Sequence, residues 1–300
     1  MRDHIHLSFQ SLKHRGLRSW LTIIGVFIGI AAVVSLISVG EGLRAAVAAQ
    51  FNFLSTNVLT VQASGLLAGP PGTGVVNPLA KGNMDDLGKI TGVDMAIGRI
   101  IEDAKLQFNG RSDLTYAGSM PDGAKRAEVE RIAQLELAEG RMLKDGDMHK
   151  VVLGNNYAQP DRFGKAIKPR DDVVIQGEKF EGVGLLEKKG SFIVDNLILM
   201  NEDIMKKIFH VNDTYSIIVV KVAEGHDMDA VKKRAEQYLR DKRNVDEGEE
   251  DFIVESPEQE LKSLDATLFA IQIFIYVIAA ISLIVGGIGI ANTMYTSVVE

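Results

Sequence analysis

The chain has 300 residues, of which 46% are hydrophobic and 24% are charged, and its formal net charge is −7. These proportions are ordinary for a soluble domain, but the mean hydropathy of +0.07 is higher than such a domain normally has. The chain contains no cysteine. Disulfide scaffolds, cysteine-ligated zinc, iron–sulfur clusters and thiol catalysis are therefore excluded.

The apolar residues concentrate in two uncharged runs, residues 21–39 and residues 266–299. The runs hold about 19 and about 34 residues, and a helix needs about 20 to cross a bilayer. We therefore predict two transmembrane helices, over 21–40 and 266–299. Neither run contains a charged residue or a histidine, which argues against an ion-coupled carrier.

The distribution of charge predicts the orientation of these spans. Residues 1–20 hold four basic residues against Asp3, a local charge of about +3 beside the first span. We predict a cytoplasmic amphipathic leader there, and a solvated basic leader is the alternative. The segment from Gly40 to Asp265 holds 29 basic and 38 acidic residues, about −9, and is predicted to lie outside the cell membrane. Glu300 then returns to the cytoplasmic side of a multi-pass protein.

A cleaved signal peptide is the main alternative for the first run. A basic leader precedes the run, and Ala46, Val47 and Ala48 resemble a small-residue cleavage site. The apolar stretch is longer than the about 7 to 15 residues of a signal peptide's apolar region. We therefore prefer an anchor that is not cleaved.

A helix start is predicted just before the second run. Ser256 is suited to cap the helix, Pro257 to occupy its first position, and Gln259 to close a capping box. A helix from Pro257 to the end of the chain would be about 66 Å long, roughly twice the hydrocarbon thickness. Residues 257–265 are therefore predicted to form a stalk outside the membrane.

A second stalk is predicted after the first span. Leu43, Val47 and Phe51 recur at helical spacing, so the helix could continue outward through residues 41–53. The neighbouring Gly40 and Gly42 leave open an ordinary span followed by a loop.

Small residues in both spans are candidate contacts between helices or between subunits. Gly25 and Gly29 form a GxxxG pair in the first span. The candidates in the second span are Ser282, Gly286, Gly287, Gly289 and Asn292. Glycine is common in membrane spans in general, which is the alternative interpretation of both groups.

We predict that residues 41–256 form an external domain of mixed α and β structure. The predicted fold class is therefore a membrane protein in which two long helices flank an α+β domain. Asn109 and Gly110 form a tight-hairpin signal between two strands. Alternating and helical patterns predict strands at 57–62, 104–108, 113–117, 151–153, 173–176, 179–183, 197–200, 215–222 and 252–254, and helices at 84–90, 128–137, 201–209 and 228–243. The length suffices for two subdomains, with a division expected near residues 121–141.

The sequence predicts no catalytic, cofactor or metal site. Residues 69–76 imitate a phosphate-binding loop, but Val75 and Val76 stand where Lys and Ser or Thr are needed. The six histidines show no metal-binding spacing, and basic residues alternate with acids, which does not support nucleic-acid binding. The acidic run 246–251 is interpreted as a solvated loop, with a cation or a basic partner as the alternative.

The order of leader, span, external domain and long second helix resembles the MacB and FtsX-like permease family of ABC transporters. Residues 17–29 (LRSWLTIIGVFIG) are similar to that family's opening span, residues 53–60 (FLSTNVLT) to its entry strand, and residues 286–294 (GGIGIANTM) to its second span. Residues 139–141 and 161–165 are weaker similarities.

The resemblance implies a MacB-type core domain with a porter-like subdomain, from residues 84–121 and 216–254, and an inserted subdomain between them. It also implies a homodimer or paired permease, an external adaptor or envelope partner, and a separate ABC ATPase that binds ATP and Mg²⁺. ATP-driven motion would be relayed to the external domain for export or extraction of a substrate. The family continues into further spans, so we expect this chain to be an N-terminal fragment.

Two other functions remain open from the sequence. A scaffold or signalling protein of the same architecture could regulate an external partner, such as a cell-wall hydrolase, without moving a substrate. A membrane-anchored enzyme is the third hypothesis, and it lacks any recognisable catalytic motif.

Overall fold

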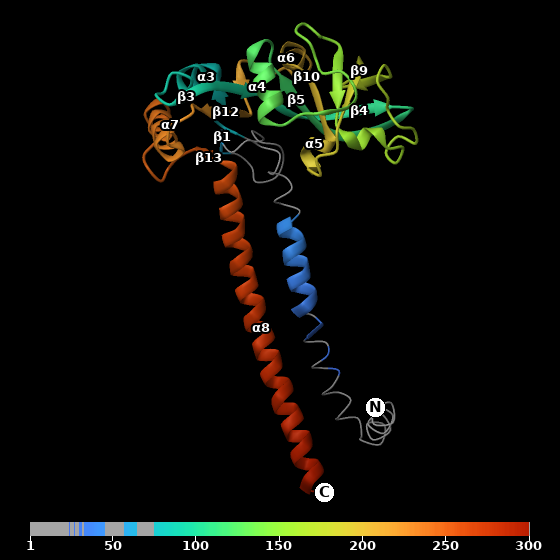
Figure 1. Ribbon diagram of the computed structural model, residues 1–300, viewed down its shortest axis with the longest axis vertical. Coiled ribbons are helices and arrows are strands. Elements are labelled where there is room, and N and C mark those ends of the chain that lie inside the picture. The colour runs from blue at the N-terminus through green and yellow to red at the C-terminus, as the bar shows by residue number, and fades with distance from the viewer. Residues whose placement is uncertain are drawn as a thin grey trace. The chain divides into compact units, whose positions relative to one another are not determined.

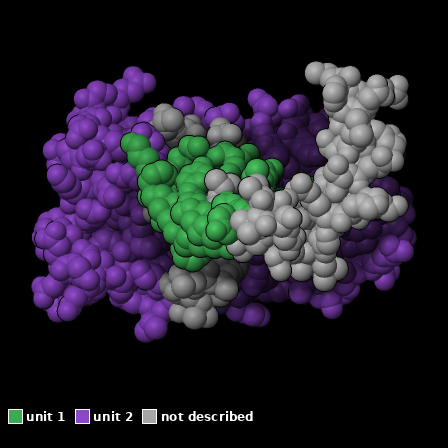
Figure 2. Space-filling view, turned by 90° about the horizontal axis from the view of Figure 1, so that it is seen from below, with its two compact units in different colours: residues 1–47, 262–300 green, residues 48–261 purple. Residues whose placement is uncertain are grey.

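The computed structural model describes residues 24, 27, 30–31, 33–45, 57–64 and 75–299. The chain divides into two compact units, residues 1–47 with 262–300 (unit 1) and residues 48–261 (unit 2), which are coloured separately in Figure 2. Each unit is described by itself, with the element labels of Figure 1.

One part of unit 2 is a four-stranded antiparallel sheet with the strand order β13-β1-β12-β3. Helices α3 and α7 both pack on this sheet and contact each other. The chain order of strands and helices is that of a split β-α-β-β-α-β fold. We call this part the four-stranded subdomain: β1 (Val58–Ala63), α3 (Lys81–Leu87), β3 (Val93–Arg99), β12 (Ile217–Val222), α7 (Met228–Arg243) and β13 (Phe252–Glu255).

Helix α7 shows how local sequence builds this subdomain. The Asp227 carboxylate caps the helix by accepting a hydrogen bond of 2.9 Å from Ala230 N–H. Val231, Ala235 and Leu239, spaced four residues apart, are completely buried. The alternating burial of β12 covers the sheet side of the same core.

The second part of unit 2 is inserted between β3 and β12. Its sheet has the order β6-β9-β7-β10-β5-β4-β8, and β8 also pairs with β9, so the sheet closes on itself. We call it the ring subdomain: β4 (Ile101–Phe108), β5 (Arg111–Met120), α4 (Ala124–Ile132), β6 (Leu137–Gly140), β7 (Lys150–Leu153), η1 (Asn155–Ala158), β8 (Asp172–Ile175), β9 (Glu178–Leu186), α5 (Phe192–Asn196), β10 (Leu197–Asn201) and α6 (Glu202–Phe209). A small pair, β2 (Leu79–Ala80) and β11 (Thr214–Tyr215), lies outside both sheets.

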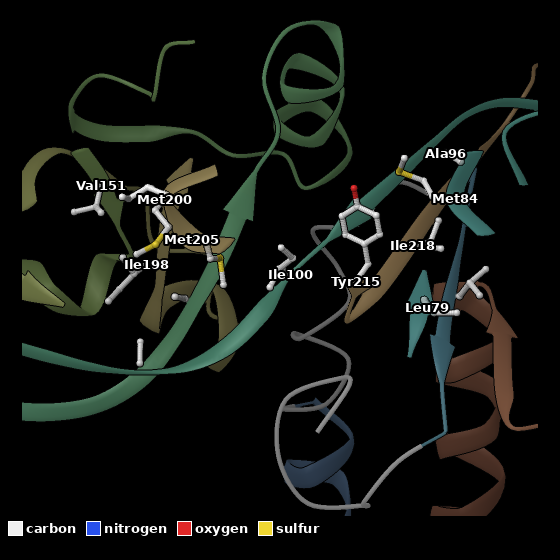
Figure 3. Packing of buried hydrophobic residues seen from close by; sticks show 14 of the residues in the cluster. Leu79, Met84, Ala96, Ile100, Val151, Ile198, Met200, Met205, Tyr215 and Ile218 are labelled. Atoms are coloured by element: carbon white, nitrogen blue, oxygen red, sulfur yellow. The ribbon is translucent and has the colours of Figure 1, made fainter. Parts of the chain in front are cut away.

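The two subdomains share one hydrophobic core. A single cluster of buried side chains contains residues from both sheets. In Figure 3, Ile100 lies between two groups of buried side chains. The group from the ring subdomain consists of Val151, Ile198, Met200 and Met205. The other group, from the four-stranded subdomain with β2 and β11, consists of Leu79, Met84, Ala96, Tyr215 and Ile218. Ile100 is completely buried and directly follows β3, so the point where the chain crosses between subdomains is itself part of the core.

Several sequence predictions are confirmed. Strands β4 and β5 form the predicted hairpin around Asn109 and Gly110, both of which have positive φ as a tight turn requires. Helix α7 has the predicted bounds, and α6 begins one residue later than predicted. The predicted helix from residue 257 is α8 (Pro257–Val299), which is 43 residues long.

Other predictions are wrong. The division near residues 121–141 is incorrect, because β4 and β5 pair into the ring sheet and the crossing therefore lies at Ile100. The helix expected over 128–137 ends at Ile132, and Leu137 begins β6. Strand β3 and helix α5 were not predicted, and α3 lies three residues earlier than expected.

Unit 1 contains the helix over residues 33–45 and most of α8. The predicted stalk over 41–53 is helical as far as residue 45, and residues 46–53 lie outside the described part of the chain. Within the described part, none of the helices combines enough length with enough apolar character to cross a membrane.

Gly154, between β7 and η1, is predicted to be essential for close packing. A Cβ atom at this position would overlap the backbone carbonyl group of Asp195 in α5. Gly154→Ala should therefore lower the free energy of unfolding by about 1 to 3 kcal/mol, as measured by urea unfolding monitored by circular dichroism. Gly82→Ala in α3 is the matched control: its Cβ meets nothing within 4 Å, so stability should stay equal or rise by about 0.5 kcal/mol. Equal losses for both variants would contradict this packing.

Asp147 is predicted to make unit 2 sensitive to acid. Burial disfavours its ionised form, but hydrogen bonds from Arg141, Lys144 N–H and Lys150 (2.7, 2.9 and 3.1 Å) hold the pKa of Asp147 well below its usual range. A lowered pKa in the folded state stabilises above the unfolded pKa of about 3.9, and this stabilisation is lost as the pH falls below it.

Asp147→Asn should consequently be less stable than the unmodified chain at pH 7, with a smaller difference at pH 3. Urea midpoints at the two pH values measure this, with exposed Asp161→Asn as the control. A difference that is the same at both pH values would exclude a role for Asp147 ionisation.

Candidate functional site

The two helices of unit 1 are joined by polar contacts. Arg44 Nε and Nη2 donate to Asp265 Oδ1 and Oδ2 of α8 at 2.9 and 3.1 Å. Gln272 Nε2 donates to Glu41 Oε1 at 3.4 Å. Residue numbers rise along one helix as they fall along the other, so the helices run antiparallel in a defined register.

The contact between Arg44 and Asp265 is bidentate, which fixes both direction and distance. Hydrogen bonding and charge attraction from Asp265 raise the pKa of Arg44, which therefore stays protonated. The side chains remain 55% and 47% exposed. Exposed ion pairs in water contribute only about 0 to 1 kcal/mol, so this pair defines a register more than it stabilises the fold.

The same helices expose many large apolar side chains. Phe274 is 66% exposed and Ile288 is 65% exposed, and similar values occur from Val34 to Val39 on the shorter helix. A soluble surface rarely carries so continuous an apolar area. The surface of unit 1 is therefore suited to an apolar partner, either lipid or other helices.

The candidate packing residues of the two runs are only partly described. Gly25 and Gly29, and the side chains of Ser282 and Asn292, lie outside the described part of the chain. Gly286, Gly287 and Gly289 lie on α8. A Cβ at Gly287 would meet nothing within 4 Å. The proposed helix contact at these small residues therefore stays a prediction.

The first turn of α8 belongs to unit 2 and is attached to α7. Gln259 N–H donates to Ser256 Oγ at 3.2 Å, and Ser256 N–H donates to Gln259 Oε1 at 3.4 Å. Lys232 Nζ donates to the same Oε1 at 2.9 Å, and Gln259 Nε2 donates to Asp229 Oδ1 at 3.3 Å. One side chain, Gln259, thus caps α8 and binds two residues of α7. The structure places Ser256, Pro257 and Gln259 together at this helix start.

The two chain crossings between the subdomains are hydrogen-bonded to each other, and we call them the neck, residues 99–101 and 215–217. Ser216 N–H donates to Arg99 O at 2.9 Å. Ser216 Oγ accepts from Ile101 N–H at 2.9 Å and donates to Ile101 O at 3.1 Å. Ser119 of β5 binds both backbone groups of Ile100: its Oγ accepts from Ile100 N–H at 2.9 Å, and its backbone N–H donates to Ile100 O at 2.9 Å. The backbone polar groups of the buried crossing are therefore satisfied.

The charged side chains of Arg99, Glu202 and Lys206 lie at or beside the neck. Arg99 Nε donates to Ser119 O at 2.6 Å, and burial lowers the pKa of Arg99 to about 10 although Glu202 opposes this shift. Glu202 pairs with Lys206 at 2.9 Å and accepts from the Tyr215 hydroxyl at 3.3 Å. Burial, followed by the Glu202 charge, raises the pKa of Tyr215 to about 12. Arg99 and Tyr215 thus keep their ordinary charge states at neutral pH.

Gly98 allows Tyr215 to lie against the neck. A Cβ at Gly98 would come within 2.5 Å of the Tyr215 ring. The sequence analysis missed the neck, because neither Ser216 nor Gly98 belongs to a motif and their contacts join residues over 100 positions apart. The pair of Arg44 and Asp265, 221 positions apart, was missed for the same reason.

The described residues include no group of three His, Asp or Glu side chains that could hold a metal ion. Within the same ranges, every fully buried side-chain nitrogen or oxygen has a hydrogen-bond partner. The notable features of the described part are the helix pair of unit 1, the anchor of α8 and the neck.

Comparison with known proteins gives consistent matches. Residues 19–238 match the family model of the MacB-like periplasmic core domain. An uncharacterized ABC transporter permease of Methanocaldococcus jannaschii is 33% identical over 299 residues, 99% of this chain and 72% of that protein. The macrolide export ATP-binding/permease protein MacB 2 of Aeromonas hydrophila is 28% identical over the full chain, which spans 46% of its length.

Solved structures share the fold. The periplasmic region of MacB from Actinobacillus actinomycetemcomitans has a TM-score of 0.54 at 14% identity, covering 72% of this chain and 95% of that one. The extracellular domain of the ABC-type transporter YknZ from Gram-positive bacteria has a TM-score of 0.50 at 15% identity, covering 67% and 100%. The shared fold agrees with the sequence matches: this chain belongs to the MacB-like permeases of ABC transporters and contains their periplasmic core domain.

Proposed function

We propose that this chain relays the ATP-driven motion of a separate ABC ATPase to unit 2, for export or extraction of a substrate. One observation carries the proposal: α8 is a single 43-residue helix whose first turn is fixed to α7 of unit 2 and whose remainder belongs to unit 1. A displacement along such a helix is transmitted because its backbone hydrogen bonds are continuous.

In this proposal residues 21–40 and 266–299 cross the cell membrane, with the N-terminus cytoplasmic and unit 2 outside. The uncharged runs, the basic leader and the acidic segment between the runs support this topology. The exposed apolar side chains of α8 support a lipid environment for it. Family membership supports a membrane location for the whole chain.

The partners follow from the same proposal. ATP and Mg²⁺ would bind to the ATPase, and this chain would need no cofactor of its own. A second copy or a paired permease would complete the membrane assembly, and an external adaptor would contact unit 2. The relatives named above are transporter permeases, which favours transport over a role as a scaffold for an external hydrolase.

The pair between Arg44 and Asp265 provides a test of the relay. In the full gene product reconstituted with its ATPase, Arg44→Asp should reduce substrate stimulation of ATP hydrolysis by roughly twofold or more, because like charges would then face each other at positions 44 and 265. The double variant Arg44→Asp with Asp265→Arg should recover the stimulation, because it restores opposite charges at the same positions. An unaltered response in Arg44→Asp, or no recovery in the double variant, would remove this pair from the relay.

The anchor of α8 makes a separate prediction about stability. Ser256→Ala removes the acceptor for Gln259 N–H and should lower the free energy of unfolding by about 1 kcal/mol, measured by urea unfolding. Ser256→Thr keeps a hydroxyl at the cap and is the matched control, with a smaller expected loss. If Thr and Ala are equally destabilising, the hydroxyl cap is not the stabilising contact.

A further inference from the structure

Glu102 occupies a position where an apolar residue is expected. Side chains alternate along β4, so positions 102, 104 and 106 share one face of the strand. Ala104 and Leu106 on this face are completely buried. Glu102 is the next inward-facing position, directly after the neck, and is half-buried. A carboxylate at this position is partly removed from water, which costs free energy that an apolar side chain would not lose.

The Glu102 side chain borders a small pocket of about 60 Å³ in unit 2. Tyr215 and Thr214 come from β11, and Val75, Pro78 and Val211 from the adjoining loops. The pocket therefore combines one carboxylate with the hydroxyl-bearing residues Thr214, Tyr215 and Ser216, and apolar residues complete its lining. It is far smaller than the roughly 300 Å³ that a drug-sized ligand requires, so it fits the end of a chain and not a whole molecule.

No basic side chain within the described ranges neutralises Glu102, which has no ion pair or side-chain hydrogen bond there. Lys206 lies beside the pocket, with Nζ 5.6 Å from the centre of the Tyr215 ring, but it already pairs with Glu202 and Asp213 at 2.9 and 3.3 Å. Arg99 is directed to Ser119 O. Burial, and then the neighbouring Asp103, raise the pKa of Glu102, as is expected for a carboxylate without a cationic partner.

We infer that this pocket is a binding site for a primary alkylammonium group. The Glu102 carboxylate would accept the charged N–H donors, Thr214 would supply a further acceptor, and Val75, Pro78 and Val211 would cover the attached methylene groups. A metal ion fits less well, because one carboxylate falls short of the several oxygen ligands that such an ion takes. Small free amines and the end of a lysine side chain share this chemistry.

The test is saturation-transfer NMR on the full chain in detergent, with n-butylammonium as the ligand and 1-butanol as its neutral counterpart. The n-butylammonium signal should be larger with the unmodified chain than with Glu102→Gln. The affinity of the unmodified chain for n-butylammonium should be at least about tenfold higher. The 1-butanol signal should be the same in both proteins, because it reports only apolar partitioning. Glu102→Gln should fold normally, since it keeps the shape of the side chain and breaks no ion pair.

Asp103→Asn is the matched control, because Asp103 is the adjacent carboxylate on the exposed side of β4. It changes the net charge equally and should weaken n-butylammonium binding far less than Glu102→Gln does, because Asp103 does not line the pocket. A third ligand, N-acetyl-lysine amide, separates the two sources of the amine: binding comparable to that of n-butylammonium identifies a lysine side chain, and much weaker binding identifies a small free amine.

Equal n-butylammonium signals in the unmodified chain and Glu102→Gln would overturn the inference, as would an equal loss in Asp103→Asn. The measurement needs neither the ATPase nor transport. Failure of this site would therefore leave the proposed relay untouched, and failure of the relay would leave the site untouched.

Discussion

The insertion of the ring subdomain between two paired antiparallel strands is the constraint on which unit 2 depends. Strands β3 and β12 are hydrogen-bonded neighbours, so the chain must leave and return at the same place. Two crossings that meet in a buried position bring unpaired backbone groups together, and each unpaired group would be costly. Ser216 and Ser119 resolve this because their hydroxyls and backbones pair with residues 99–101. With Ile100 buried between the sheets, the crossing becomes a packed joint instead of a flexible linker.

A packed joint has a mechanical consequence for the proposed relay. In that proposal, a displacement that enters unit 2 at the first turn of α8 would pass to α7 through Gln259 and then to the sheet that α7 covers. The sheet ends at the neck, where hydrogen bonds of 2.9 to 3.1 Å and a shared core would oppose independent motion. The ring subdomain would then move with the four-stranded subdomain, which is what a relay to an external partner requires.

The parts of this structure that the sequence predicted are those with local causes. The helix over 228–243, with Val231, Ala235 and Leu239 on one face, and the turn at Asn109 and Gly110 each depend on residues close together in the chain. The site could not be predicted in this way. Ser216 meets Ile101 across 115 positions, and Arg44 meets Asp265 across 221. Strand β3 was missed because its burial does not alternate, with Ala96, Ile97 and Gly98 all buried in succession, and the ring closes through pairings that no single segment encodes.

The weakness of the contact between Arg44 and Asp265 fits a moving part better than a structural one. A buried pair would resist separation, because each charge left alone would cost several kcal/mol. An exposed bidentate pair gives a defined register at small energetic cost, so the two helices could slide or separate when a partner supplies only a few kcal/mol. The anchor at Gln259 has the opposite character, since three polar partners hold it: Lys232, Asp229 and the buried Ser256. A firm attachment of α8 in unit 2 with a weak contact in unit 1 would place the compliance of the proposed relay between the two helices and not at the start of α8.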